Sequence, residues 1–288
     1  QLGEQLYDGK LKLTVNARDD FGRPSRRWEY DGKGIGTYAK TELIREEYTT
    51  EVTGKTLYEE LGSEIIDSIK RGGANDYRLY VAIDGETTRN VLGTAYFTEG
   101  SMVRNNNNGV GDTGKGVLTQ LFVDGVNKRV DIAIINTYLA QATKNYSSAN
   151  DDVTLKVYKI DEKPAVGSGS YVKTANQTEN FPVDGDDFDI KDVKKDDFFL
   201  VTVAQGEIQT MAKPEVLSDV TLNAFKVDSW VRSDGTQYDY ASTAQYDAEV
   251  LDTFDASNMK DVTYNIFLDK YGYMVGLEQN EAVNQYLL

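Results

Sequence analysis

The feature that most constrains the fold is a repeated pattern: an apolar run, a short turn carrying glycine, and a second apolar run. Such a pattern is typical of β-hairpins. The turns lie at Asp84-Gly85, Asp124-Gly125, Gln205-Gly206 and Tyr271-Gly272. Four hairpins predict a chain of repeated small antiparallel β units. Their irregular spacing argues against a solenoid with a fixed period.

Two segments alternate regularly between polar and apolar residues, as half-buried strands do. The apolar residues expected in the core are Leu11, Leu13 and Val15 in one segment, and Val153, Leu155 and Val157 in the other. A third segment, residues 220–231, changes the parity of its apolar residues. A long strand with a bulge near Ala224 would explain this change, because one extra residue exchanges the two faces.

One helix is clearly indicated over residues 56–70. Thr56 and Glu59 form a capping box, an apolar stripe repeats every four residues from Leu57, and Gly72 follows the last turn. A second, weaker helix is expected over residues 243–251. The predicted fold is therefore mainly β: tandem small antiparallel β-barrel or sandwich-like modules with one or two accessory helices.

The chain has 288 residues, about twice the usual domain length. We expect three parts: an N-terminal β module (1–115) carrying the helix, a central β module (116–214) and a C-terminal β module (215–288). The Asn/Gly-rich loop 104–116 suggests the first boundary, and Pro214 suggests the second. Residues 1–10 lack the basic and apolar regions of a signal peptide, which suggests a mature or excised piece.

The sequence contains no cysteine and no histidine. Disulfide frameworks, thiolate metal sites and Ser-His-Asp catalysis are therefore excluded. An enzyme would have to use carboxylates, lysine or tyrosine alone, so we expect no enzyme, no catalytic residues and no cofactor.

The formal net charge is -16. Such a charge opposes binding to nucleic acid and to anionic membrane surfaces. No apolar run approaches the ~18 residues of a spanning helix, so membrane insertion is not expected.

One motif nearly matches a phosphate-binding loop. Gly109 is followed by Gly114 and Lys115 at the required spacing, but Gly116 stands where a Ser or Thr would bind magnesium. The run after it, VLTQLFV, reads as a strand rather than a helix. We interpret the segment as a loop between modules.

Acidic residues cluster at Asp184, Asp186, Asp187, Asp189 and Asp192. Their oxygens suit calcium, which takes six to eight such ligands. The central glycine and terminal glutamate of the helical calcium loop are missing, so a solvated acidic turn is the simpler interpretation. The pairs Asp151/Asp152 and Asp196/Asp197 are interpreted in the same way. Structural calcium stays a possibility, with no metal ligand assigned.

Two further possibilities concern carbohydrate. Trp28, Trp230 and several tyrosines suit a sugar-binding surface, although aromatic residues also fill β cores. A carboxylate glycosidase would need two buried carboxyls about 5–9.5 Å apart in a cleft, and no pair among the 47 acidic residues is marked as special.

A set of short motifs, in order, resembles the body segment of clostridial surface proteins that carry S-layer homology domains. The resemblance extends from about residue 20 to about residue 278. The motifs are Gly22-Arg23-Pro24, Trp28-x-Tyr30, Ile35-Gly36-Thr37-Tyr38, Tyr48-Thr49, Thr56-Leu57-Tyr58, Gly114-Lys115-Gly116-Val117, LFVDG, Asn136-Thr137-Tyr138, the run from Asp234 to Tyr240, and the run from Leu268 to Tyr273.

The resemblance implies an extracellular protein of the Gram-positive cell surface, with no catalytic residues to carry over. Anchoring in that family is done by separate modules that this sequence does not contain. We therefore expect a structural building block of a surface layer or filament that associates with copies of itself. A glycan- or host-protein-binding adhesin module is the alternative.

Overall fold

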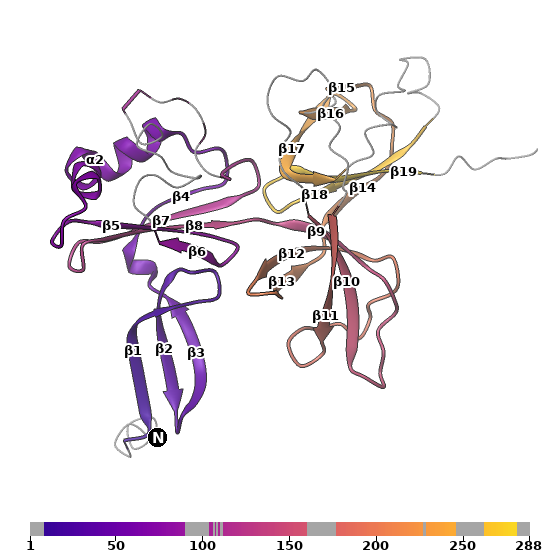
Figure 1. Cartoon of the computed structure of the whole chain (residues 1–288). Helices are drawn as coiled ribbons and strands as arrows, with labels where there is room; N and C mark the ends of the chain where they lie inside the picture. Colours follow the sequence, from indigo (N-terminus) through magenta and orange to yellow (C-terminus); the bar gives the residue numbers. More distant parts are fainter. Residues whose placement is uncertain are drawn as a thin grey trace, which may run out of the picture. The chain divides into compact units, whose positions relative to one another are not determined.

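The computed structural model describes residues 9–89, 104–105, 107, 109, 112–159, 177–226, 229–245 and 262–280. Within these residues the chain is mainly β, with several small sheets and one α-helix, as the sequence predicts (Figure 1). Contacts divide it into two compact units: residues 1–136 with 204–206, and residues 137–203 with 207–288.

The described residues form the following strands, in chain order. They are β1 (Leu11–Arg18), β2 (Pro24–Tyr30), β3 (Lys33–Ala39), β4 (Ile44–Tyr48), β5 (Arg78–Ile83), β6 (Glu86–Arg89), β7 (Leu118–Asp124), β8 (Arg129–Ile135), β9 (Tyr138–Ala142), β10 (Asp152–Lys159), β11 (Gln177–Asp184), β12 (Phe198–Ala204), β13 (Glu207–Ala212), β14 (Glu215–Val220), β15 (Ala224–Lys226), β16 (Trp230–Ser233), β17 (Thr236–Gln245), β18 (Tyr264–Leu268) and β19 (Met274–Gln279). The helix α2 spans Gly54–Arg71, and a short 3-10 turn, η1, spans Thr41–Leu43.

The core of the first unit lies between α2 and a five-stranded sheet of order β4-β7-β8-β5-β6. Leu57, Leu61 and Ile66 of the helix pack against Leu121 and Ile132 of the sheet. β5 and β8 pair in parallel, whereas the other neighbours in this sheet are antiparallel. Strands from both sides of residue 115 therefore build one sheet, while the three-module division of the chain stays a prediction.

The helix begins earlier than predicted and is broken in the middle. Thr53 is the N-cap, and its hydroxyl accepts a hydrogen bond from the backbone N–H of Thr56, so the predicted Thr56/Glu59 capping box is wrong. Gly62 has φ 77° and ψ 160°, which interrupts the helix. Gly72, with φ 64°, closes it in the left-handed conformation, as its position predicts.

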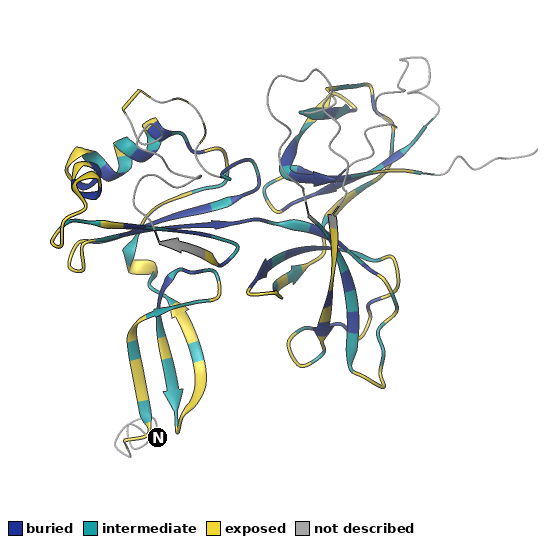
Figure 2. Cartoon of the chain, in the orientation of Figure 1, coloured by how far each residue is buried: buried dark blue, intermediate teal, exposed yellow. Residues whose placement is uncertain are grey.

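A three-stranded antiparallel sheet of order β1-β2-β3 forms the N-terminal part of the first unit. The predicted burial of β1 is wrong: Leu11 is only partly buried, Leu13 is 39% exposed and Val15 is 50% exposed. Figure 2 shows this sheet mostly intermediate or exposed, in contrast to the buried strands of the five-stranded sheet. The alternation is present, but no second layer of the described residues buries it.

The second unit contains a five-stranded sheet, β11-β10-β9-β12-β13, and a six-stranded sheet, β14-β18-β19-β17-β16-β15. Val153, Leu155 and Val157 are fully buried in the first of these, as predicted. A separate apolar cluster joins strands of both sheets, and in it the Phe198 and Phe267 ring centroids lie 4.5 Å apart. β17 and β19 pair in parallel.

All four predicted turns join neighbouring strands. The tightest are Asp84-Gly85, with φ 48° and 83°, and Gln205-Gly206, with φ 54° and 78°. Positive φ at both central residues is the geometry that matches the twist of a hairpin. Two more Asp-Gly hairpins occur, at Asp31-Gly32 and Asp234-Gly235.

The structure differs from two predictions: the bulged strand near residue 224 and the helix that starts at residue 243. β14 pairs with β18, and β15 pairs with β16, so residues 220–231 form separate strands rather than one bulged strand. Thr243–Gln245, the start of the predicted second helix, belongs to β17. Residues 246–251 lie outside the described residues.

Candidate functional site

The most developed polar site lies in the first unit, around Asp131. This residue is in β8 on the side of the sheet away from α2, since its neighbours Val130 and Ile132 belong to the helix-facing core. Strand pairing places Tyr80 of β5 directly beside it. The side chain of Arg18 reaches Asp131 from the end of β1.

Two guanidinium groups hold the Asp131 carboxylate. Arg18 Nη2 donates to Oδ1 at 2.6 Å, and Arg129 Nη2 donates to the same oxygen at 3.1 Å. Arg129 Nε lies 2.9 Å from Oδ2 as an ion pair without hydrogen-bond geometry. Both guanidiniums also lie over the Tyr80 ring, at 4.1 Å for Arg129 and 5.1 Å for Arg18. The result is a cross-link between the β1-β2-β3 sheet and the five-stranded sheet.

Burial raises the pKa of Asp131 to about 6, against the opposing effect of Arg18. The carboxylate is at the wall of a pocket of about 190 Å³ that Lys40, Arg78 and Asp124 also line. Asp124 accepts hydrogen bonds from the backbone of Val126 and Asn127, so it caps its own turn. Both acids of the pocket are therefore engaged in structural contacts.

The sequence gives no signal for this site. Arg18 and Asp131 are 113 residues apart, and neither belongs to a recognisable motif. Only the strand pairing of the folded unit brings them together.

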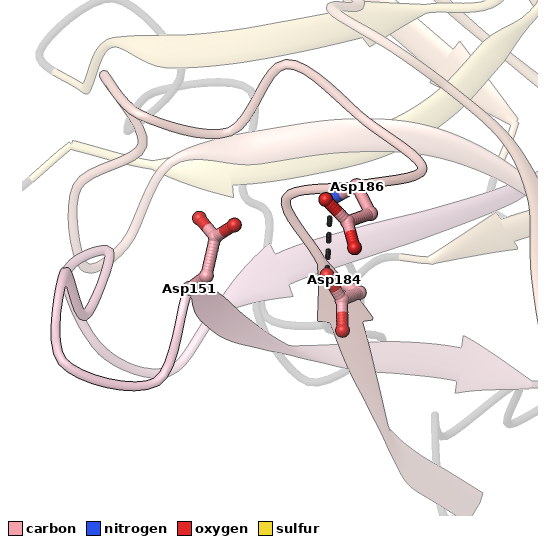
Figure 3. Close-up of side chains that lie close together, drawn as sticks. All are labelled: Asp151, Asp184 and Asp186. Carbon is pink, nitrogen blue, oxygen red and sulfur yellow. Dashed lines mark hydrogen bonds between the residues drawn. The ribbon is translucent and has the colours of Figure 1, made fainter.

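The predicted acidic cluster is brought together in part (Figure 3). Carboxylate oxygens of Asp184, Asp186 and Asp151 lie within 4.8 Å of one another. Asp187, Asp189 and Asp192 do not belong to this group, whereas Asp151, expected to be an independent surface acid, does. β10 and β11 pair Asp152 with Asp184, which explains why Asp151 lies beside the turn after β11.

The loops of this acidic group are ordered by hydrogen bonds. The Asp186 N–H donates to Asp184 Oδ1 at 2.9 Å, and the Tyr146 hydroxyl donates to Asp151 Oδ1 at 2.6 Å, which raises the pKa of Tyr146. Asp184 and Asp186 are exposed, and Asp151 is half-buried. Three adjacent carboxylates have the chemistry to hold a hard cation such as calcium, and exposed acids also gather without one.

At the end of the near-phosphate loop, two backbone amides donate hydrogen bonds within the protein. The Gly116 N–H donates to Thr49 O, and the Val117 N–H donates to Gly114 O. β7 follows directly, where a phosphate-binding loop requires a helix. The arrangement is that of a loop leading into a strand, as the sequence predicts.

The two tryptophans are half-buried. Trp28 lies in the middle of β2, and Trp230 begins β16, with the Arg232 guanidinium 5.2 Å from its ring centroid. The most exposed large aromatic side chain among the described residues is Tyr38 of β3, at 61%.

In the described part of the chain, no helix is both long and apolar enough to cross a bilayer. Comparison with models of protein families, with curated proteins and with solved structures gives no match.

Proposed function

We propose that the chain is an extracellular structural building block of a bacterial surface layer or surface filament, which associates with copies of itself and has no catalytic role. It would sit on the outside of the cell. The resemblance to clostridial surface proteins supports this location, as does the absence of cysteine.

One observation carries the proposal. Each sheet ends in strands that pair on one side only within the described residues, among them β1, β3, β11 and β15. An unpaired strand edge is a template on which another chain can add. A protein that presents several such edges is suited to assembly.

The absence of a catalytic role is supported by the Asp131 pocket. Acid–base or nucleophilic catalysis requires a carboxylate that is free to reach a substrate. Here Arg18 and Arg129 engage both oxygens of Asp131, and turn amides engage Asp124.

The alternative, a glycan- or host-protein-binding adhesin, is favoured by a different observation. Tyr38 is largely exposed on the sheet that also carries Trp28 and Tyr30. Aromatic side chains displayed on a strand surface suit stacking on sugar rings.

Sedimentation velocity over a wide range of protein concentration, followed by electron microscopy, tests the proposal. A structural building block should sediment faster as concentration rises and should form filaments or sheets. A strict monomer at the highest concentration, with saturable binding on a glycan array, would favour the adhesin.

A further inference from the structure

The β1-β2-β3 sheet carries an apolar face that the described residues leave partly open to solvent. Strand register places Leu13 opposite Trp28 and Leu11 opposite Tyr30, and directly opposite residues project from the same face. Tyr38, two residues from Gly36, joins this face because Gly36 is the partner of Trp28. We call this surface the aromatic face, defined by Leu11, Leu13, Trp28, Tyr30 and Tyr38.

The two faces of the sheet differ in chemistry. The opposite face carries Lys12, Thr14, Arg27, Glu29 and Thr37, as the alternation requires. A sheet with one apolar and one polar face is the pattern of a sheet that buries one side. Here Leu13 and Tyr38 stay exposed, so the described chain does not supply the layer that the pattern calls for.

A contact within β3 holds the Tyr38 ring in place on the aromatic face. A Cβ atom at Gly36 would lie 2.6 Å from ring atoms of Tyr38, so the ring lies directly over the glycine backbone. Aromatic cover of a strand glycine fixes the ring and pins the register. The exposed Tyr38 ring is therefore held in place before any partner arrives.

Charge distinguishes this sheet from the rest of the chain. Residues 10–40 contain eight Lys or Arg and four Asp or Glu, a net charge of +4. The remaining 23 basic and 43 acidic residues carry -20. On the aromatic face itself, strand register places Arg26 opposite Tyr38 and Lys33 opposite Tyr30. The Arg26 side chain is 41% exposed, and Lys33 is exposed.

We propose that the aromatic face docks on the acidic surface of a second copy of this chain, outside its residues 10–40. The apolar side chains supply the area to be buried, and the surrounding cations match the negative charge of the partner. Two aromatic faces would repel each other, so the contact is head to tail. A head-to-tail contact that does not close produces an open filament. This inference rests on the proposed function, since it names the surface through which assembly occurs.

The test is sedimentation velocity of the full chain and its variants at matched concentrations. Replacing Leu13→Thr together with Tyr38→Thr should weaken self-association at least tenfold, because the exposed apolar groups are lost while strand propensity is kept. The matched control, Val126→Thr, removes an apolar side chain that is 92% exposed in the turn between β7 and β8, and it should associate like the wild type.

A second variant tests the contribution of charge to the contact. It also distinguishes loss of the contact from a folding defect in the first variant. Arg26→Gln with Lys33→Gln leaves the apolar side chains of the aromatic face intact and should weaken association and reduce its dependence on sodium chloride. Circular dichroism should show both variants folded.

The outcomes separate the two proposals. An assembling wild type whose Leu13/Tyr38 and Arg26/Lys33 variants assemble equally well overturns the docking inference alone. A strictly monomeric wild type overturns both proposals. Binding of the wild type to an anionic polysaccharide that the Leu13/Tyr38 variant loses, without self-association, assigns the face to a glycan and also overturns the inference.

Discussion

Leu13 and Leu155 occupy equivalent positions in two alternating segments of similar sequence character, yet they have different surroundings. Leu155 is fully buried in a cluster that strands of one sheet and neighbouring loops build, whereas Leu13 is 39% exposed. Alternation specifies which side chains share a face. It does not specify whether another layer covers that face, and this is why the prediction succeeds for β10 and is wrong for β1.

This difference has a measurable consequence for stability. Leu155→Ala should lower the free energy of unfolding by about 2–5 kcal/mol, because the transfer free energy is lost and a cavity remains. Leu13→Ala in the monomer should lower it by less, about 1 kcal/mol, since Leu13 is already 39% exposed in the folded protein. Urea denaturation of both variants at low protein concentration checks the pair. Similar losses would contradict the described burial.

Asp131 predicts a pH dependence with a definite sign. Its pKa is about 6 in the folded protein and 3.8 when unperturbed. The folded state therefore takes up the proton first as the pH falls, and its stability relative to the Asp131→Asn variant should increase between pH 7 and pH 4. A shift of this size corresponds to at most about 3 kcal/mol.

Urea denaturation of the wild type and Asp131→Asn at pH 7 and pH 4.5 measures this change. The comparison with the variant removes the contribution of the other acids. A difference in stability that stays constant between the two pH values would show that the two arginines, rather than burial, dominate the pKa.

At the scale of elements, α2 shows how one glycine overrides helix propensity. Gly62 has a backbone conformation, φ 77° and ψ 160°, that is almost restricted to glycine. On each side of it the helix buries its own group of residues, Leu57 and Leu61 before it and Ile65, Ile66 and Ile69 after it. The break lets both groups face the same core.

Gly62→Ala should therefore destabilise the protein by about 1–3 kcal/mol, although alanine is the better helix former by about 1 kcal/mol. Free space surrounds the site, so backbone strain is the cause. Thermal unfolding measures the effect, with Glu64→Ala on the exposed side as the control. A stabilised Gly62→Ala variant would mean that the helix straightens without loss of packing.

Hairpins are the elements that sequence predicts best, because two residues determine their geometry. The same Asp-Gly signal is present at Asp31 and Asp234, and both form hairpins in addition to the four predicted ones. The parallel pairs β5–β8 and β17–β19 had no such signal. A parallel pair is determined by long-range packing, and short sequence patterns do not encode that.

At the scale of the whole molecule, the acidic group of Asp151, Asp184 and Asp186 combines two segments that sequence alone treated separately. The cluster was predicted from residues close in sequence, but only two of the five predicted members belong to it. The third comes from the turn before β10, through the pairing of β10 with β11. Residue type alone indicates that these carboxylates could hold a cation. Which carboxylates lie together depends on the register of the strands.

Calcium should strengthen self-association more than sodium does at equal ionic strength. Sodium only screens the net charge of -16, whereas calcium has the oxygen chemistry to bridge carboxylates of two molecules, as we propose here. Sedimentation velocity in millimolar calcium and in matched sodium chloride measures the difference. Asp184→Asn with Asp186→Asn should reduce the calcium effect, while the more distant Asp234→Asn should not. Equal behaviour in the two salts would limit calcium to screening.

The strand order of the first unit also determines when each of its sheets can form during synthesis. The β1-β2-β3 sheet joins neighbours in sequence and is complete once Ala39 has emerged from the ribosome. The five-stranded sheet needs β8, so it closes only after Ile135. Until then β5 can contact α2 and β6 but lacks the strand that pairs with its other edge. Likewise, the ion pair between Arg18 and Asp131 cannot form until Asp131 has been synthesised. The nascent chain therefore contains a complete small sheet while the core next to α2 is still incomplete. During this interval a chaperone that binds exposed apolar surface would protect the chain most.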